Sequence, residues 1–251
     1  MTLTLAPEVA YTFMLVVVRV AAMLMVVPAL GESSIPGRIR IGLALVLALL
    51  LYPAAEPMIR PPSGLGELVG AVGFEIVIGV FIGGAARILM SAAQIAGSVI
   101  AYQLGLAFAQ NVDPSIGIQS AMLSSFLSVV AVTVIFALDL HHLLIHALSD
   151  SYTLFAPGGA MPAGAFTAHA VDIVARSFNV AVQLAAPFLV FGIVFYVGLG
   201  ILSRLMPQVQ IFFVAMPANI FLGLVILLLT MSSIGFWFAE HFARELQPML
   251  L

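Results

Sequence analysis

Histidine and aspartate residues in the middle of the chain have the types and spacing of a metal-binding site. Asp139 precedes the pair His141 and His142. His146 follows His142 by four residues, which places these two on one face of a helix. Imidazole and carboxylate groups are common zinc ligands, so a metalloenzyme that uses His142 and His146 is one hypothesis. The Glu of His-Glu-x-x-His metalloproteases is missing, and such residues also mark the polar end of a helix. We therefore expect no bound metal and no cofactor.

Four charged residues fall within or at the ends of apolar stretches, namely Arg19, Glu67, Glu75 and Arg87. A charge at the centre of a bilayer costs several kcal/mol, so the position of each of these residues in an apolar stretch requires an explanation. Glu67 and Glu75 are eight residues apart and share roughly one helix face, with Arg87 twelve residues further on. One hypothesis is a secondary transporter with an ion path along these residues. The alternatives are that they pair with polar groups on neighbouring helices or subunits, or that the segment does not lie fully in lipid.

A polar stretch from Ala93 to Pro114 interrupts the apolar sequence. Lipid offers no hydrogen-bond partner, so such a stretch at membrane depth is found where protein buries it or where it lines a water-filled path. Polar residues recur at helical spacing around the beginning of this stretch and form a polar stripe on one helix face. The stripe consists of Ser91, Gln94, Ser98 and Tyr102, and Gln103 follows Tyr102. We expect the stripe to face protein or water.

The loop that follows the stripe, Gly105 to Pro114, is the candidate functional element. Gly105 allows a bend, and Asp113 is a plausible N-cap for the next helix with Pro114 at its first position. Its first half is apolar, with the residues Leu106, Ala107, Phe108 and Ala109. A tip made of Leu106 and Phe108 could close a narrow pore by excluding water. An ordinary turn between packed helices is the alternative.

Composition defines the elements that must position these residues. Of 251 residues, 63% are hydrophobic and only 8% are charged, and the mean hydropathy is +1.22. One soluble core cannot hide this excess, so the sequence predicts a polytopic membrane protein. The net charge of −3 argues against nucleic-acid binding, and the lack of Cys excludes disulfides. The first basic residue, Arg19, lies inside the first apolar run, so we expect residues 8 to 30 to be a retained helix.

Six or seven apolar segments are long enough for helices that cross a membrane. They are Val9 to Leu30, Ile39 to Ala55, Leu65 to Met90, Ser91 to Gln110, Ile116 to about Leu148, Phe178 to Ser203 and Val209 to Phe238. Sustained two-residue alternation is missing, so we expect an all-α protein. Pro28, Pro187 and Pro217 predict kinks and hence bent helical hairpins, although Pro is common in membrane helices. The patterns Gly66-x-x-x-Gly70 and Gly79-x-x-x-Gly83 predict close helix contacts.

Short motifs along nearly the whole chain resemble the FliR family of flagellar biosynthetic proteins, which has counterparts in virulence type III secretion systems. In order they are Arg19-Val20-x5-Val26-Val27-Pro28, Ile35-Pro36-x-Arg38-Ile39-Arg40-Ile41-Gly42-Leu43-Ala44, Glu75-x3-Gly79, Gln94-x-Ala96-Gly97, Gln103-x-Gly105-x2-Phe108-Ala109-x3-Asp113-Pro114, His141-His142-Leu143, Ala186-Pro187 and Gly200-x3-Arg204-x2-Pro207-Gln208, followed by Phe212, Pro217 and Gly223. The chain departs from the family at Leu140, where Gly is frequent, and at Gln210, where Asn is frequent.

This resemblance implies a non-enzymatic part of the protein export gate in the bacterial inner membrane, at the flagellar basal body. It implies one FliR-like domain over residues 1–251, whose bent helices pack into a larger pore-forming assembly lifted largely out of the bilayer plane. The implied partners are FliP-like, FliQ-like, FlhB-like and FlhA-like proteins, membrane lipid and unfolded flagellar subunits. The family's plug-like loop corresponds to Gly105–Pro114, and the motif turn to Arg204, Pro207 and Gln208. A virulence system and a secondary transporter are the alternative functions.

Overall fold

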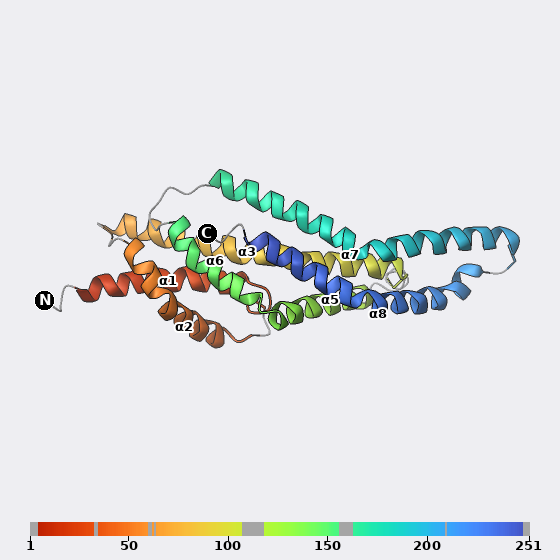
Figure 1. Ribbon diagram of the computed structural model, residues 1–251, viewed down its shortest axis with the longest axis horizontal. Coiled ribbons are helices and arrows are strands. Elements are labelled where there is room, and N and C mark those ends of the chain that lie inside the picture. The colour runs from red at the N-terminus through yellow and green to blue at the C-terminus, as the bar shows by residue number, and fades with distance from the viewer. Residues whose placement is uncertain are drawn as a thin grey trace. The chain divides into compact units, whose positions relative to one another are not determined.

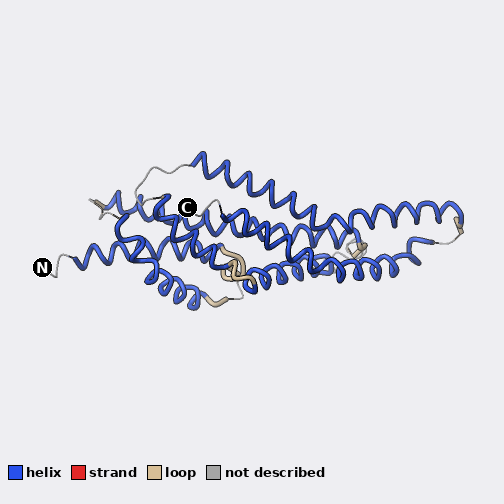
Figure 2. Tube along the Cα trace, viewed as in Figure 1, coloured by secondary structure: helices blue, strands red, loops and turns tan. Residues whose placement is uncertain are grey.

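All regular elements in the described part of this computed structural model are helices (Figure 2). The structure describes residues 5–32, 35–59, 62, 64–106, 118–155, 163–208 and 210–247. The helices are α1 (Leu5–Val26), α2 (Gly37–Ala55), the 3-10 helix η1 (Glu56–Met58), α3 (Leu65–Gln103), α5 (Ile118–Ala137), α6 (His141–Leu154), α7 (Ala163–Leu205) and α8 (Ile211–Leu246) (Figure 1).

Five of these helices have the length and composition to cross a membrane, and α5 with α6 would make a sixth span. The five segments are Glu8–Val26, Gly37–Met58, Leu65–Gln103, Phe166–Leu205 and Val214–Leu246. The expectation of an all-α polytopic membrane protein is therefore confirmed.

Several helix boundaries differ from those expected, since α7 begins at Ala163 and not at Phe178, and α8 ends at Leu246 and not at Phe238. Two of the expected segments are also divided differently. α3 is one helix of 39 residues, where two segments meeting at Met90 and Ser91 were expected, because it contains no Pro that would end it. The segment from Ile116 to Leu148 is instead divided into α5 and α6 by a turn at 138–140. Asp139 has a φ of 56°, a left-handed conformation that ends a helix and that hydropathy does not reveal.

Two of the prolines expected to kink helices lie inside continuous helices, so the predicted kinks would bend these helices without ending them. Pro187 lies inside α7 and Pro217 inside α8, and both helices continue on either side. Pro28 lies just beyond the last residue of α1. Membrane helices tolerate proline where neighbouring groups take up the freed carbonyl.

The chain divides into two compact units, and α3, α7 and α8 contribute residues to both. Unit 1 comprises residues 1–89, 139–174 and 242–251, and unit 2 comprises residues 90–138 and 175–241. The single domain expected from the resemblance stays a prediction.

In unit 1, α1 packs against α2 (Figure 1) and makes a close contact with α3. A Cβ atom added to Gly79 would lie 2.8 Å from the Ala22 Cβ, and one added to Gly83 would lie 2.7 Å from the Met23 carbonyl oxygen. These distances leave no room for a side chain, so this glycine pair lets the two backbones touch, as its spacing predicts. A Cβ atom added to Gly66 or Gly70, by contrast, would meet no described atom of another element within 4 Å.

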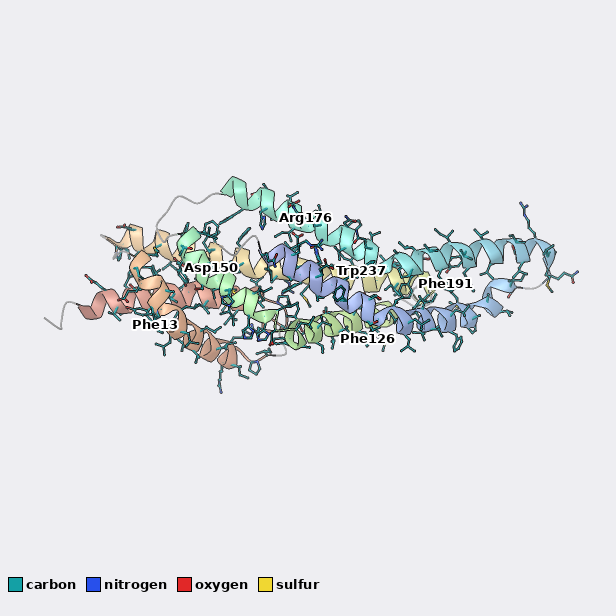
Figure 3. All side chains as sticks on the ribbon, viewed as in Figure 1. Phe13, Phe126, Asp150, Arg176, Phe191 and Trp237 are labelled. Carbon is teal, nitrogen blue, oxygen red and sulfur yellow. The ribbon has the colours of Figure 1, made fainter. Side chains whose placement is uncertain are left out.

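Unit 2 has a similar close contact between α3 and α5. A Cβ on Gly97 would lie 2.6 Å from the Ser124 Cα. Many apolar side chains of α5, α7 and α8 nevertheless remain exposed. Phe126 of α5 and Trp237 of α8, both labelled in Figure 3, are 47% and 52% exposed. Lipid or other chains must cover them, because exposed apolar patches of this extent are rare on soluble monomers.

Gly79→Ala should destabilise the protein by about 1–3 kcal/mol, because the added methyl group overpacks the contact of α1 with α3. The matched control is Gly84→Ala on the same helix, where a Cβ meets nothing within 4 Å. That control should be neutral or stabilising, since Ala is the better helix former by about 1 kcal/mol. Denaturant titration of both variants in detergent micelles measures the difference. Equal stability of the two variants would contradict the close contact.

Candidate functional site

The candidate loop begins with a helix end in unit 2 that has a regular geometry. α3 ends at Gln103, and Gly105 takes a φ of +74°, so the expected bend is present. The Gly105 amide donates to the Tyr102 carbonyl at 3.1 Å, and the Leu106 amide donates to the Ala101 carbonyl at 3.0 Å. These two bonds form a Schellman motif, in which Gly is favoured because the backbone is left-handed there. We call Gln103 to Leu106 the loop base.

Two helices hold the loop base within unit 2. The buried Leu104 side chain fills the space next to Gly223 of α8, and the Gln103 carboxamide lies against Gly192 of α7. Asn219 of α8 adds a hydrogen bond, donating from Nδ2 to the Gln103 carbonyl oxygen at 3.0 Å. A side chain at either glycine would occupy the same space, so the missing Cβ atoms create the two recesses that hold the loop base.

The rest of the predicted plug lies outside the described residues. Leu106 is half-buried at the end of the loop base. The other plug residues of the prediction are Ala107, Phe108, Ala109, Asp113 and Pro114, and their roles stay predictions.

The polar stripe before the loop does not face one single environment. The Gln94 amide donates to the Ser128 hydroxyl of α5 at 3.4 Å, whereas the Ser98 hydroxyl donates to the Ile95 carbonyl of its own helix. Tyr102 is 66% exposed, and Ser91 is half-buried. Part of the stripe therefore faces protein, as expected, and its Tyr102 end is open in the isolated chain.

Unit 1 contains a fully buried ion pair. The Arg19 guanidinium of α1 donates from Nε and Nη2 to the two carboxylate oxygens of Glu75 on α3, the second bond measuring 3.1 Å. Both side chains have no exposed surface. Such a two-bonded pair is the strong form of this interaction because the planar guanidinium matches the carboxylate.

α6 and the residue after it complete the cluster around Arg19. Nη1 donates to the Ser151 hydroxyl at 2.8 Å, and Nη2 donates to the Phe155 carbonyl at 3.1 Å. The Tyr152 ring lies under the guanidinium, with its centroid 4.0 Å from Cζ, a cation–π contact. We call these residues with Glu75 the Arg19 cluster. It links α1, α3 and α6 and gives a buried charge the partners that it needs.

The other two charges do not join this cluster. Glu67 is exposed although it is eight residues from Glu75. Arg87 is also exposed, and its Nη1 donates to the Val26 carbonyl at 3.5 Å, at the last residue of α1. A cation is favourable at that helix end. Of the four charges, the structure therefore brings Arg19 and Glu75 together in a buried pair, and the ion-path hypothesis stays a prediction.

The potential metal ligands that lie close together are not the set expected from the sequence. Asp139, His141 and His142 have ligand atoms within 4.8 Å of one another, whereas His146, one turn further along α6, is outside this group.

The motif turn between α7 and α8 is exposed, with Arg204 in the last turn of α7 and Pro207 and Gln208 after it.

Sequence reasoning did not find Ser151, Tyr152 and Asn219. Each is a polar residue in a helix that contacts a segment far away in the sequence, and spacing along one helix cannot reveal such a contact. A sequence signal was present for the recesses that receive Gln103 and Leu104, because a Gly inside a helix often has a packing reason, as Gly192 and Gly223 do here.

Comparison with known proteins gives an independent result. Residues 10–244 match the model of a family described as bacterial export proteins, family 1. The chain is 44% identical to the flagellar biosynthetic protein FliR of Caulobacter vibrioides over 94% of each chain. It is 31% identical to FliR of Bacillus subtilis, over 94% of this chain and 92% of the relative. It is also 30% identical to Yop proteins translocation protein T of Yersinia pestis, over 82% and 80%.

Glu75→Gln should destabilise the protein by about 3–5 kcal/mol, because it leaves the Arg19 guanidinium buried without a counter-charge. The double variant Arg19→Met with Glu75→Leu should lose less than Glu75→Gln alone, since it removes both charges together. Glu67→Gln is the control, because an exposed residue of the same helix should change stability by only about 0.5 kcal/mol. Equal losses for Glu75→Gln and Glu67→Gln in micelle unfolding would contradict the buried pair.

Proposed function

The chain belongs to the family of bacterial export proteins, family 1, and from this premise we propose that it is a core component of the flagellar type III protein export gate. In this proposal it is non-enzymatic, lies in the inner membrane at the flagellar basal body, and forms part of the channel for unfolded flagellar subunits. The observation that carries the proposal is the 44% identity to a flagellar FliR over 94% of both chains.

The lengths of three helices support a role inside a larger assembly. α3, α7 and α8 have 39, 43 and 36 residues. At a rise of 1.5 Å per residue they measure about 58, 64 and 54 Å, roughly twice the thickness of about 30 Å of a hydrocarbon core. Lipid therefore cannot surround the full length of such a helix unless the helix is steeply tilted.

The surface of α7 and α8 supports the same conclusion. In an apolar stretch of 18 residues in each helix, only 22% of the residues in α7 and 17% of those in α8 are buried within this chain. Water is a poor environment for the remaining apolar side chains, so the parts beyond the lipid need protein partners. We propose that FliP-like and FliQ-like subunits cover them, with FlhB-like and FlhA-like proteins nearby.

We further propose that Gly105–Pro114 is the plug that seals the closed channel. The loop base supports this role because the Schellman motif and the recesses at Gly192 and Gly223 fix where the loop starts. A gate needs such a fixed end, so that the apolar residues Leu106 and Phe108 reach the same position each time the channel closes.

Sequence identity favours the flagellar system over a virulence system, because the identity is 44% to a flagellar relative and 30% to the Yop translocation protein.

To test the proposal, the gene should be deleted from a flagellated host and replaced by a tagged copy. We expect loss of flagella on deletion, rescue by the tagged copy, and co-purification with FliP-like and FliQ-like subunits. Normal flagella without the gene would overturn the flagellar assignment. Solute uptake by the isolated protein in vesicles would favour the transporter instead.

Replacing Leu106 and Phe108 together with Gly should make cells that express the gate permeable to small solutes, because the apolar seal is lost. The matched control, Leu106→Met with Phe108→Leu, keeps an apolar tip and should stay closed. Growth in the presence of a toxic small solute measures the leak. An assembled Gly variant, shown by co-purification, that leaks no more than the control would contradict the plug while leaving the export function intact.

A further inference from the structure

We propose that Asp139, His141 and His142 bind one divalent transition-metal ion, for which zinc is the best fit. The three residues form the turn between α5 and α6 and the start of α6. The proposal reverses the expectation from the sequence, and it uses a different ligand set, with His141 in place of His146.

The backbone of the turn brings the three side chains together. Asp139 has a left-handed φ of 56°, and its carbonyl accepts a hydrogen bond from the His142 amide at 3.0 Å. The rings of His141 and His142 lie with their centroids 4.2 Å apart, although consecutive helix residues normally point about 100° apart. The ligand atoms of all three residues lie within 4.8 Å of one another.

Small rotations would turn this arrangement into a metal site. Ligand atoms around a tetrahedral zinc ion are about 3.4 Å apart, given bond lengths near 2.0–2.1 Å. The Asp139 and His142 side chains are 76% and 59% exposed, so they can rotate without repacking the interior. Three protein ligands leave the fourth position to water, which is a common arrangement for zinc.

The ligand types select the class of ion. Two imidazoles favour zinc, nickel or copper over magnesium and calcium, which prefer oxygen ligands. The alternative is that Asp139 and His142 simply bond to each other. Their nearest atoms, Oδ1 and Nδ1, are 4.0 Å apart, which is too long for a hydrogen bond. The gap between them is instead one that an ion could bridge.

A bound ion would stabilise the first turn of α6. That helix carries Ser151 and Tyr152, which hold Arg19 within the same unit. An ion that binds the folded protein only should raise its unfolding temperature. The site therefore predicts a stabilising role that does not depend on the export function.

The test uses the full chain, purified in detergent with a tag that contains no histidine and treated with a chelator. Zinc binding is measured by equilibrium dialysis, and cobalt binding by the visible absorption of tetrahedral Co²⁺. We expect about one ion per chain, and a shift of the unfolding transition to higher temperature when zinc is added. His141→Ala and His142→Ala should each weaken binding by about tenfold or more.

His146→Ala is the matched control, because His146 is an exposed histidine of the same helix outside the cluster. It should bind zinc as the unchanged protein does. Equal binding by all three variants, or binding lost only in His146→Ala, would overturn the proposal. All of the changed side chains are at least partly exposed, so the variants should fold, and circular dichroism checks that they do.

Discussion

The buried guanidinium of Arg19 is the interaction on which unit 1 depends. A fully buried charge is tolerated only where partners replace the water that it loses, and here α3 and the end of α6 supply them. Glu75 neutralises the charge, Ser151 and the Phe155 carbonyl accept its remaining hydrogen bonds, and Tyr152 covers one face. If Glu75, Ser151 or the Phe155 carbonyl moved away, a buried hydrogen-bond donor of Arg19 would lose its partner, so the cluster defines how α1, α3 and α6 meet.

That cluster is possible only because α1 and α3 approach closely. Gly79 lies one turn from Glu75 on α3 and touches the backbone of α1 at Arg19 itself. A larger residue at this position would push the helices apart and lengthen the bonds of the ion pair. The glycine and the ion pair therefore act together, since one brings the backbones into contact and the other makes only one alignment of them favourable.

Composition and periodicity were sufficient for the fold class, because an apolar fraction of 63% leaves no soluble alternative. They also predicted the bend at Gly105 and the contact at Gly79 and Gly83. They failed where a local backbone conformation sets the end of a helix. The left-handed conformation of Asp139, for example, divides one apolar segment into α5 and α6. They failed again for Ser151 and Asn219, since their partners lie 132 and 116 residues away in the sequence. The role of Leu106 and Phe108 as an apolar tip stays a prediction from the sequence.

Several helix glycines of this chain have a role opposite to the flexibility that glycine suggests in a sequence. Helices in lipid gain little from burying apolar surface against each other, so close packing and hydrogen bonds must hold them. Gly97 lets α3 contact α5, while Gly192 and Gly223 receive the side chains of Gln103 and Leu104. At these positions a missing side chain makes the structure more rigid, because it allows contacts that any Cβ atom would prevent. Within the loop base, only Gly105 uses the conformational freedom of glycine, and it does so where the candidate gate begins.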